Sequence, residues 1–223
     1  MSSDSVLPHI ADGNGWKTLI TLVNMDSEAV EYALTFHSSG SSALWSLDLA
    51  GVGKVNTVSG TIPIGGSVFF ETTNPPGATA TGWAQLENNY NNIGGMAVFR
   101  FSPGDLQDTE AVVPFASKYD DDFYIPFDNR NGFVTSIAAV NPSTYSAATV
   151  FVEFRDASGA RILLDTITLQ PLEHLAFSTV EKFPETDGKN GVIEFTTSAY
   201  GISALGIRFN PKFSFTSVHA LSK

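Results

Sequence analysis

The stretch GWKTLITLVN, residues 15–24, recurs later in the chain as GFVTSIAAVN, residues 132–141. Both copies begin with glycine and an aromatic residue, carry threonine at the fourth position and end in Val-Asn. Alternate residues after the glycine are mostly apolar, which is the pattern of a β-strand with one buried face. The chain therefore contains the same predicted strand twice.

The similarity extends well beyond these strands. The segments AVEYALTF, TIPIGGSVFFET and MAVFRF of the first half correspond, in the same order, to ATVFVEF, TLQPLEHLAFST and ALGIRF of the second. Short alternating runs separated by Gly, Pro and Asn turns predict antiparallel strands, and so many strands bury their apolar faces only as two packed sheets. We therefore predict an all-β chain of two tandem antiparallel β-sandwich units of the immunoglobulin-like kind, related by internal duplication, over residues 1–117 and 118–223.

The alternation of side chains also assigns faces within the late strands VFRF and GIRF. Phe99 and Ile207 are expected on the core face of their units, and Arg100 and Arg208 on the outward face. Each arginine is predicted to lie against an aromatic ring of a neighbouring strand, a contact worth about 1 kcal/mol. A role at a ligand site or a protein interface is the alternative.

Composition narrows the function classes. The chain has 223 residues, of which 43% are hydrophobic, and a formal net charge of -11, which disfavours nucleic acid as a partner. It has no cysteine, so disulfides and thiolate chemistry are excluded. No run is apolar enough for a membrane span, and the first residues lack a signal-peptide pattern, although this does not decide the compartment.

The pattern of a Pro-containing entry strand, Asp/Asn-Gly-aromatic-x-Thr, Val-Asn and a late Arg-Phe strand resembles the tandem β-sandwich modules of large secreted bacterial proteins. The resemblance rests on GWKTLITLVN, GFVTSIAAVN, VFRF and GIRF, and covers nearly the whole chain in two copies. It implies an extracellular or cell-surface location in a bacterium and no enzymatic role, and it transfers no catalytic or binding residue.

The chain lacks the usual catalytic signatures. Its four histidines have no metal-binding spacing, and it contains neither the Gly-x-Ser-x-Gly elbow of serine hydrolases nor a complete phosphate-binding loop. We therefore expect no enzyme, no catalytic residue and no cofactor, with calcium as the one alternative. An enzyme would need polar groups that converge where the two repeats join.

Acidic residues near the start of the second repeat leave room for calcium, which prefers several carboxylate and carbonyl oxygens. The candidates are Asp120, Asp122 and Asp128. Neighbouring aspartates on an extended chain point in alternating directions, and Asx hydrogen bonds explain turns at such positions equally well. The simpler expectation is a structural turn.

Two aromatic residues are candidates for a ligand or an interface. Alternation places Trp83 with Gln85 and Glu87, away from the core, where another part of the protein covers it or a sugar ring stacks on it. Tyr90 lies in the asparagine-rich turn ENNYNN. The leading hypothesis is a non-catalytic module pair for adhesion, spacing or assembly at a bacterial surface, whose partner is a protein, a surface polysaccharide or a second copy of the chain. The alternative is a carbohydrate-binding module.

Overall fold

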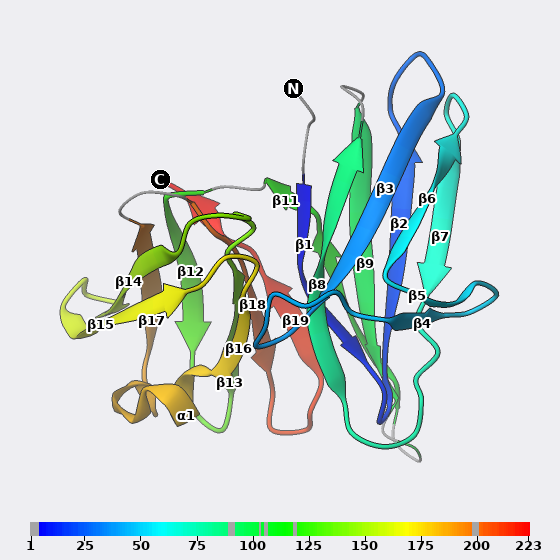
Figure 1. The fold of residues 1–223 in the computed structure, drawn as a ribbon. Coiled ribbons are helices and arrows are strands. Elements are labelled where there is room, and N and C mark those ends of the chain that lie inside the picture. Colours follow the sequence, from blue (N-terminus) through cyan, green and yellow to red (C-terminus); the bar gives the residue numbers. More distant parts are fainter. Residues whose placement is uncertain (1–4, 89–91, 103, 105–106, 118–119, 198–200) are drawn as a thin grey trace. The chain divides into compact units, whose positions relative to one another are not determined.

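The computed structural model describes residues 5–88, 92–102, 104, 107–117, 120–197 and 201–223. The chain is all-β, as predicted, and its strands form several antiparallel sheets (Figure 1). It divides into two compact units, Met1–Ser117 and Lys118–Lys223. No helix in the described part of the chain is long and apolar enough to cross a membrane.

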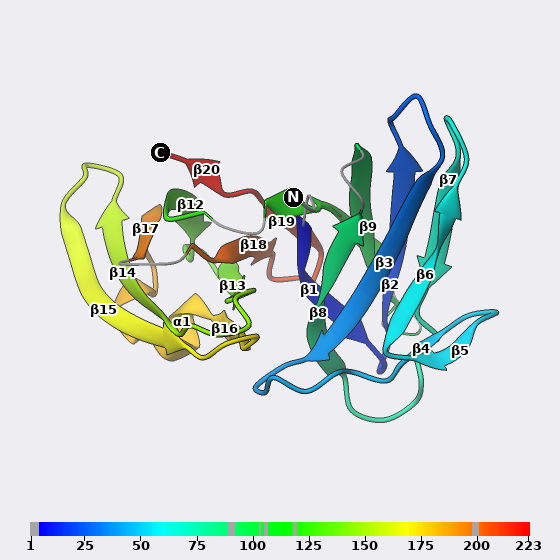
Figure 2. The ribbon, with the colours of Figure 1, turned by 45° about the horizontal axis from the view of Figure 1, so that its top comes forward.

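Unit 1 consists of two larger sheets and a hairpin. The five-stranded sheet has the order β11-β1-β8-β3-β6, and the four-stranded sheet has the order β10-β9-β2-β7. The hairpin β4-β5 projects from the unit (Figure 2). The strand bounds are β1 Ser5–Asp12, β2 Trp16–Asn24, β3 Val30–Ser38, β4 Leu47–Leu49, β5 Gly53–Val55, β6 Thr57–Ile62, β7 Ser67–Glu71, β8 Ala80–Asn88, β9 Ile93–Phe101, β10 Thr109–Pro114 and β11 Ala116–Ser117.

Unit 2 also has a five-stranded sheet, β15-β14-β17-β12-β20, and a four-stranded sheet, β16-β13-β18-β19. A short helix and a 3-10 turn follow β16. The bounds are β12 Asp122–Asp128, β13 Val134–Val140, β14 Ala148–Asp156, β15 Arg161–Leu169, β16 His174–Ser178, α1 Thr179–Lys182, η1 Pro184–Thr186, β17 Asn190–Thr197, β18 Ser203–Phe209, β19 Phe215–Val218 and β20 Leu221–Ser222.

The two units share one strand order. With β4 and β5 set aside, the strands of the two five-stranded sheets correspond one to one in chain order and in position. The sheet of unit 1 reads β6-β3-β8-β1-β11, and that of unit 2 reads β15-β14-β17-β12-β20. The same is true of β10-β9-β2-β7 and β19-β18-β13-β16. The hairpin β4-β5 lies in the longer middle segment that distinguishes the first half of the sequence from the second.

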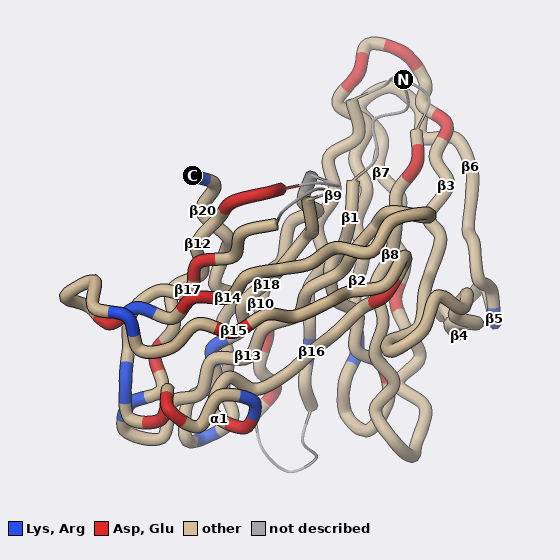
Figure 3. The backbone as a smooth tube through the Cα atoms, turned by 60° about the vertical axis from the view of Figure 1, so that its left-hand side comes forward, with Lys and Arg blue, Asp and Glu red and all other residues tan. Residues whose placement is uncertain are grey.

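Each unit buries apolar residues from both of its sheets, which is compatible with a β-sandwich. In unit 2 one hydrophobic cluster joins Ile125 of β12 and Val152 of β14 to Ile137 of β13 and Ala204 of β18. Charged residues lie mostly in turns and near strand ends, and long stretches of strand carry none (Figure 3). Burial of alternate apolar side chains therefore accounts for the layers.

The glycine of each repeated stretch belongs to a tight turn that starts β2 or β13. Asn14 and Gly15 have φ angles of 52° and 93°, and Asn131 and Gly132 have 55° and 79°. Positive φ at both central residues is the requirement of a type I′ turn, which Asn-Gly meets at low steric cost. A Cβ atom on Gly15 would also lie 2.8 Å from the Ser102 carbonyl oxygen, so a close approach adds to the need for glycine.

The threonine of each stretch links the two sheets of its unit. The Thr18 hydroxyl on β2 donates to the Ala11 carbonyl on β1 at 2.9 Å and accepts from the Ala11 amide at 3.2 Å. Thr135 on β13 bonds the amide and carbonyl of Asp128 on β12 in the same way, at 3.0 and 3.4 Å. Both threonines are fully buried, so each hydroxyl joins the main chain of one sheet to a strand of the other inside the unit.

The asparagine that ends each stretch holds loops at the opposite end of the strand. Asn24 Nδ2 donates to the carbonyls of Glu28, Ile62 and Pro63, and its Oδ1 accepts from the Asp26 amide. The corresponding bonds of Asn141 go to the carbonyls of Ser146, Leu169 and Gln170 and come from the Ser143 amide. Glycine, threonine and asparagine recur because each unit needs the same turn, link and loop anchor.

Candidate functional site

The outward placement predicted for Arg208 is wrong. Residues directly opposite one another in a sheet share a face, and Arg208 lies opposite the buried Thr135, whereas Arg100 lies opposite Lys17. The residue of unit 1 that occupies the place of Arg208 is therefore Phe99, opposite Thr18. The similar segments VFRF and GIRF therefore pair with β2 and β13 in registers that differ by one residue, and a shift of one residue exchanges the two faces of a strand.

Arg208 forms a cation–π and ion-pair cluster at the end of its sheet. Its guanidinium carbon lies 3.9 Å from the centre of the Phe133 ring, and its Nη2 lies 3.2 Å from Asp128 Oδ2. The predicted contact with a neighbouring aromatic ring is thus present for Arg208. The arrangement stabilises the start of β13 and gives this arginine a structural role.

Arg100 is paired on the outward face of β9. Its Nε lies 2.6 Å from Glu110 Oε1 on β10, and the side chain is about one-third exposed. The hydrogen bond to Glu110 raises the pKa of the guanidinium above its ordinary value, so it stays charged throughout the accessible pH range. The outward position predicted for Arg100 is confirmed.

The structure does not bring the proposed calcium ligands together. Asp122 and Asp128 stand at the two ends of β12, which at about 3.3 Å per residue places them roughly 20 Å apart. The described residues contain no group of three or more His, Asp or Glu that could hold a metal ion. The described structure therefore does not gather Asp120, Asp122 and Asp128 around one point.

Each of these aspartates has another partner. Both carboxylate oxygens of Asp128 face guanidinium groups, with Arg130 Nε at 2.8 Å and Arg208 Nη2 at 3.2 Å. The hydrogen bond from Arg130 is the main cause that lowers the pKa of Asp128. Asp122 pairs with Lys223 at 3.2 Å, and Asp120 accepts from the Ser222 hydroxyl at 2.8 Å, so each carboxylate has a partner within unit 2.

Trp83 is covered, which is the first of its two predicted alternatives. The side chain is 0% exposed, and its ring is stacked on His37 of β3, with centroids 4.3 Å apart and planes at 13°. At least one face of the indole is thus occupied by a neighbouring strand. Burial also lowers the pKa of His37 from 6.5 to about 4, so the imidazole is neutral in this stack at physiological pH. Tyr90, the other predicted aromatic, lies outside the described residues.

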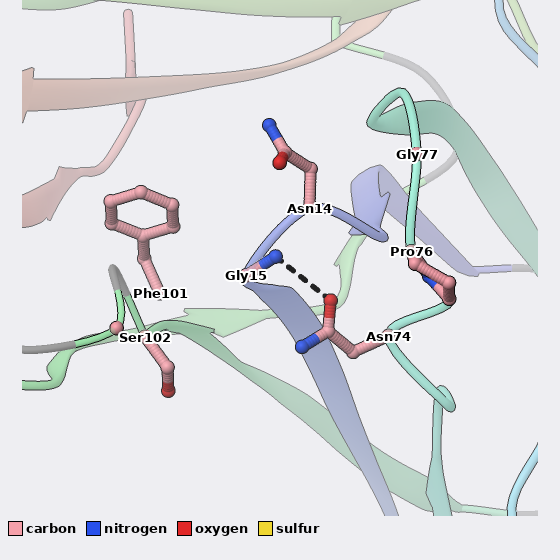
Figure 4. A pocket seen from close by; sticks show the side chains of 8 residues that line it. Asn14, Gly15, Asn74, Pro76, Gly77, Phe101 and Ser102 are labelled. Atoms are coloured by element: carbon pink, nitrogen blue, oxygen red, sulfur yellow. Dashed lines mark hydrogen bonds between the residues drawn. The ribbon is translucent and has the colours of Figure 1, made fainter.

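Both units have a pocket beside the turn that opens the repeated stretch. In unit 1 its volume is about 550 Å³, and Asn14, Asn74 and Phe101 are among its lining residues. The Gly15 amide donates to Asn74 Oδ1 at 2.8 Å, which ties the loop before β8 to the turn (Figure 4). Phe101 stacks on Trp16, with the ring centroids 4.7 Å apart. The lining is a mixture of amide groups and one aromatic ring.

The pocket of unit 2 lies beside the corresponding turn and has a volume of about 570 Å³. Its lining is more apolar and includes Val180, Phe209 and Phe213, with Glu181 beside them. Phe213 is 68% exposed and has a φ of 64°, a conformation that costs a non-glycine residue about 1 kcal/mol. We name these two cavities the end pockets. The sequence carries no signal for the backbone of Phe213, because aromatic residues rarely adopt positive φ.

Comparisons with protein-family models, with curated proteins and with solved structures found no match to this chain.

Proposed function

We propose that the chain is a non-catalytic pair of β-sandwich modules of the immunoglobulin-like kind, related by internal duplication, that serves adhesion, spacing or assembly at a bacterial surface. The observation that carries the proposal is the matched use of Thr18 and Thr135, and of Asn24 and Asn141, in the two units. These buried polar residues are the most distinctive feature shared by the repeats, and their hydrogen bonds go to the protein's own main chain. What the repeats have in common is thus a means of holding a rigid scaffold.

The outer surfaces differ between the units, which suits a scaffold that presents contacts. Unit 1 carries the β4-β5 hairpin, and unit 2 carries α1 and η1 at the place that follows β16. Connecting segments on a rigid β framework are the usual carriers of recognition. Duplication of the framework with divergence of the connections fits a module pair that binds neighbours and performs no chemistry.

Display of the chain on the surface of a non-adherent bacterium tests this function. We expect displaying cells to aggregate or to attach to protein-coated or polysaccharide-coated surfaces more than cells that display an unrelated β-sandwich of similar size. Folding of the displayed chain is checked by its resistance to protease. A folded, displayed chain that changes neither aggregation nor attachment would contradict the proposal.

A carbohydrate-binding module is the second candidate, and the end pockets favour it. A flat apolar ring beside amides or a carboxylate is suited to a sugar, whose C–H face stacks on the ring while its hydroxyl groups form hydrogen bonds. Phe213 with Glu181 offers this combination in unit 2, and Phe101 with Asn14 and Asn74 offers it in unit 1.

Calorimetric titration with soluble polysaccharides of the major classes tests the second candidate. Binding in unit 2 should be weakened roughly tenfold or more by Phe213→Ala, because one stacked ring contributes about 1–3 kcal/mol in comparable sites. Leu164→Ala, which removes another exposed apolar side chain of unit 2, is the matched control. If no glycan class releases or absorbs heat on titration, or if Phe213→Ala leaves the binding constant unchanged, the proposal of a sugar site in unit 2 is contradicted.

A further inference from the structure

The outward face of the sheet β10-β9-β2-β7 in unit 1 is apolar over most of its length. Thr21 of β2 lies opposite Phe69 on one side and Met96 on the other, and Met96 lies opposite Pro114. In the next row along the strands, Leu19 lies opposite Val98 on one side and Glu71 on the other, and Val98 lies opposite Val112. Phe69 is 71% exposed and Met96 is 46% exposed. We name this surface, formed by Leu19, Thr21, Phe69, Met96, Val98 and Pro114, the outer apolar face.

Charged side chains lie at one end of this face and neutralise one another. Lys17 Nζ lies 2.9 Å from Glu71 Oε1, and Arg100 Nε lies 2.6 Å from Glu110 Oε1. The chain as a whole carries a formal charge of -11, so most of its surface repels a second copy. The outer apolar face combines exposed apolar side chains with a locally balanced charge, and repulsion between copies is smallest where two such faces meet.

From these observations we propose that the outer apolar face binds the same face of a second copy of the chain, which forms a twofold-symmetric dimer by stacking sheet on sheet. A twofold axis parallel to the strands keeps each row of side chains opposite the same row of the partner copy. Apolar side chains then meet mostly apolar side chains, and the ion-paired ends meet each other. This inference rests on the proposed assembly role and names its partner.

The size of the face sets the strength of the dimer. The strands β2 and β9 have nine residues each, β10 has six and β7 has five, which at about 3.3 Å per residue and a spacing of about 4.8 Å gives roughly 460 Å² per copy, or about 920 Å² in total. This lies below the 1,200–2,000 Å² of standard specific interfaces and above most crystal contacts, which bury less than about 800 Å². We therefore expect a weak dimer that depends on protein concentration. Salt should strengthen it, because screening reduces the repulsion between two acidic chains.

Sedimentation velocity of the full chain over a range of concentrations tests the proposal. The expected result is a dimer whose dissociation constant rises roughly tenfold or more in Phe69→Lys and in Met96→Lys, because each places a charge within an apolar contact. The control Leu164→Lys changes an exposed apolar residue of unit 2 and should leave the constant unchanged. A monomer at every concentration up to about 1 mM, or a dimer indifferent to both face variants, would overturn the proposal.

Cross-linking provides a second, independent measurement. The chain has no cysteine, so Thr21→Cys introduces a single thiol within the outer apolar face. Facing sheets lie about 10 Å apart, which a short bis-maleimide spans, and a covalent dimer is expected. Thr166→Cys, on the exposed part of β15, is the matched control and should remain monomeric. Equal cross-linking of the two variants would contradict the proposed face.

The two proposals fail separately. If displaying cells neither aggregate nor attach while the purified chain dimerises through Phe69 and Met96, the surface function is wrong and the dimer stands. If displaying cells aggregate while the purified chain stays monomeric, the surface function stands and the outer apolar face is not its contact.

Discussion

Replacing Asn24 by alanine removes a buried amide that holds three backbone carbonyls and one backbone amide of unit 1. Each hydrogen bond contributes about 1 kcal/mol net, and a buried carbonyl left without a donor costs about 1–3 kcal/mol more. Because the loops can relax toward water, we expect a total loss of about 3 kcal/mol. That is a large part of the roughly 5–15 kcal/mol that stabilises a typical domain.

Urea unfolding followed by tryptophan fluorescence measures this loss in the unit concerned. The chain has three tryptophans, Trp16, Trp45 and Trp83, and all of them belong to unit 1, so the signal reports unfolding of that unit. With a urea dependence of about 2 kcal/mol per molar, a loss of about 3 kcal/mol lowers the midpoint by about 1.5 M. Asn56→Ala changes an exposed asparagine of the same unit and should shift the free energy of unfolding by less than about 0.5 kcal/mol.

The corresponding change in unit 2, Asn141→Ala, should lower the urea midpoint of unit 2, followed by circular dichroism, by a similar amount, because the hydrogen-bonding pattern is the same. If Asn24→Ala shifts the fluorescence midpoint no more than Asn56→Ala does, the reasoning about the loop anchor is refuted.

Three further outcomes follow from the contacts. Burial penalises the charged form of His37, whose pKa is about 4 in the folded chain against 6.5 when exposed, so stability should fall as the pH drops from 6.5 toward 4 because the unfolded chain binds the proton first. Urea midpoints at several pH values should show this fall, and His37→Phe should make it smaller, although His9, whose pKa burial also lowers to about 4, keeps part of it. Gly15→Ala should destabilise unit 1 by about 2–3 kcal/mol, because the new Cβ atom would lie 2.8 Å from the Ser102 carbonyl oxygen. Gly40→Ala should cost only about 1 kcal/mol, because no atom lies within 4 Å of the new Cβ atom. Equal shifts of the melting temperature would exclude the contact with Ser102 as the cause. Arg208→Met should lower the free energy of unfolding of unit 2 by about 1–2 kcal/mol, and Arg100→Met should lower that of unit 1 by less than about 1 kcal/mol, as measured by denaturant unfolding. A larger effect for Arg100 would contradict the structural roles assigned to the two arginines.

Much of the architecture follows from local patterns. Alternating apolar residues and Gly-containing turns predicted an all-β chain because period-two burial and positive φ are properties of short segments. The strand that carries Trp16, Thr18 and Ile20 has the buried face that its sequence indicates, and so does the strand that carries Phe133 and Ile137. The role of Asn24 was not predictable, because two of the three carbonyls that it bonds, those of Ile62 and Pro63, come from a segment distant in the chain.

The candidate sites depended on contacts that a single sequence does not contain. Tertiary packing covered Trp83 with His37, and alternation along one strand gives no information about what lies over its outward face. The aspartates proposed for calcium are close in sequence, but β12 separates Asp122 from Asp128 because a strand extends by about 3.3 Å per residue. The end pockets and the outer apolar face likewise bring together residues from several strands.

By itself the sequence determined the all-β class and the glycine-containing turns, because each of these follows from the conformation or burial of a short segment, and it showed that threonine and asparagine recur in matching strands. Only the tertiary structure decided the register of β18, which places Arg208 opposite Thr135 and against Phe133. Arg100 lies on the other face of its strand, although the residues around the two arginines are similar in sequence. The physical reason is that side-chain direction in a sheet has a period of two, so pairing with β13 one residue out of step reverses every face of the strand.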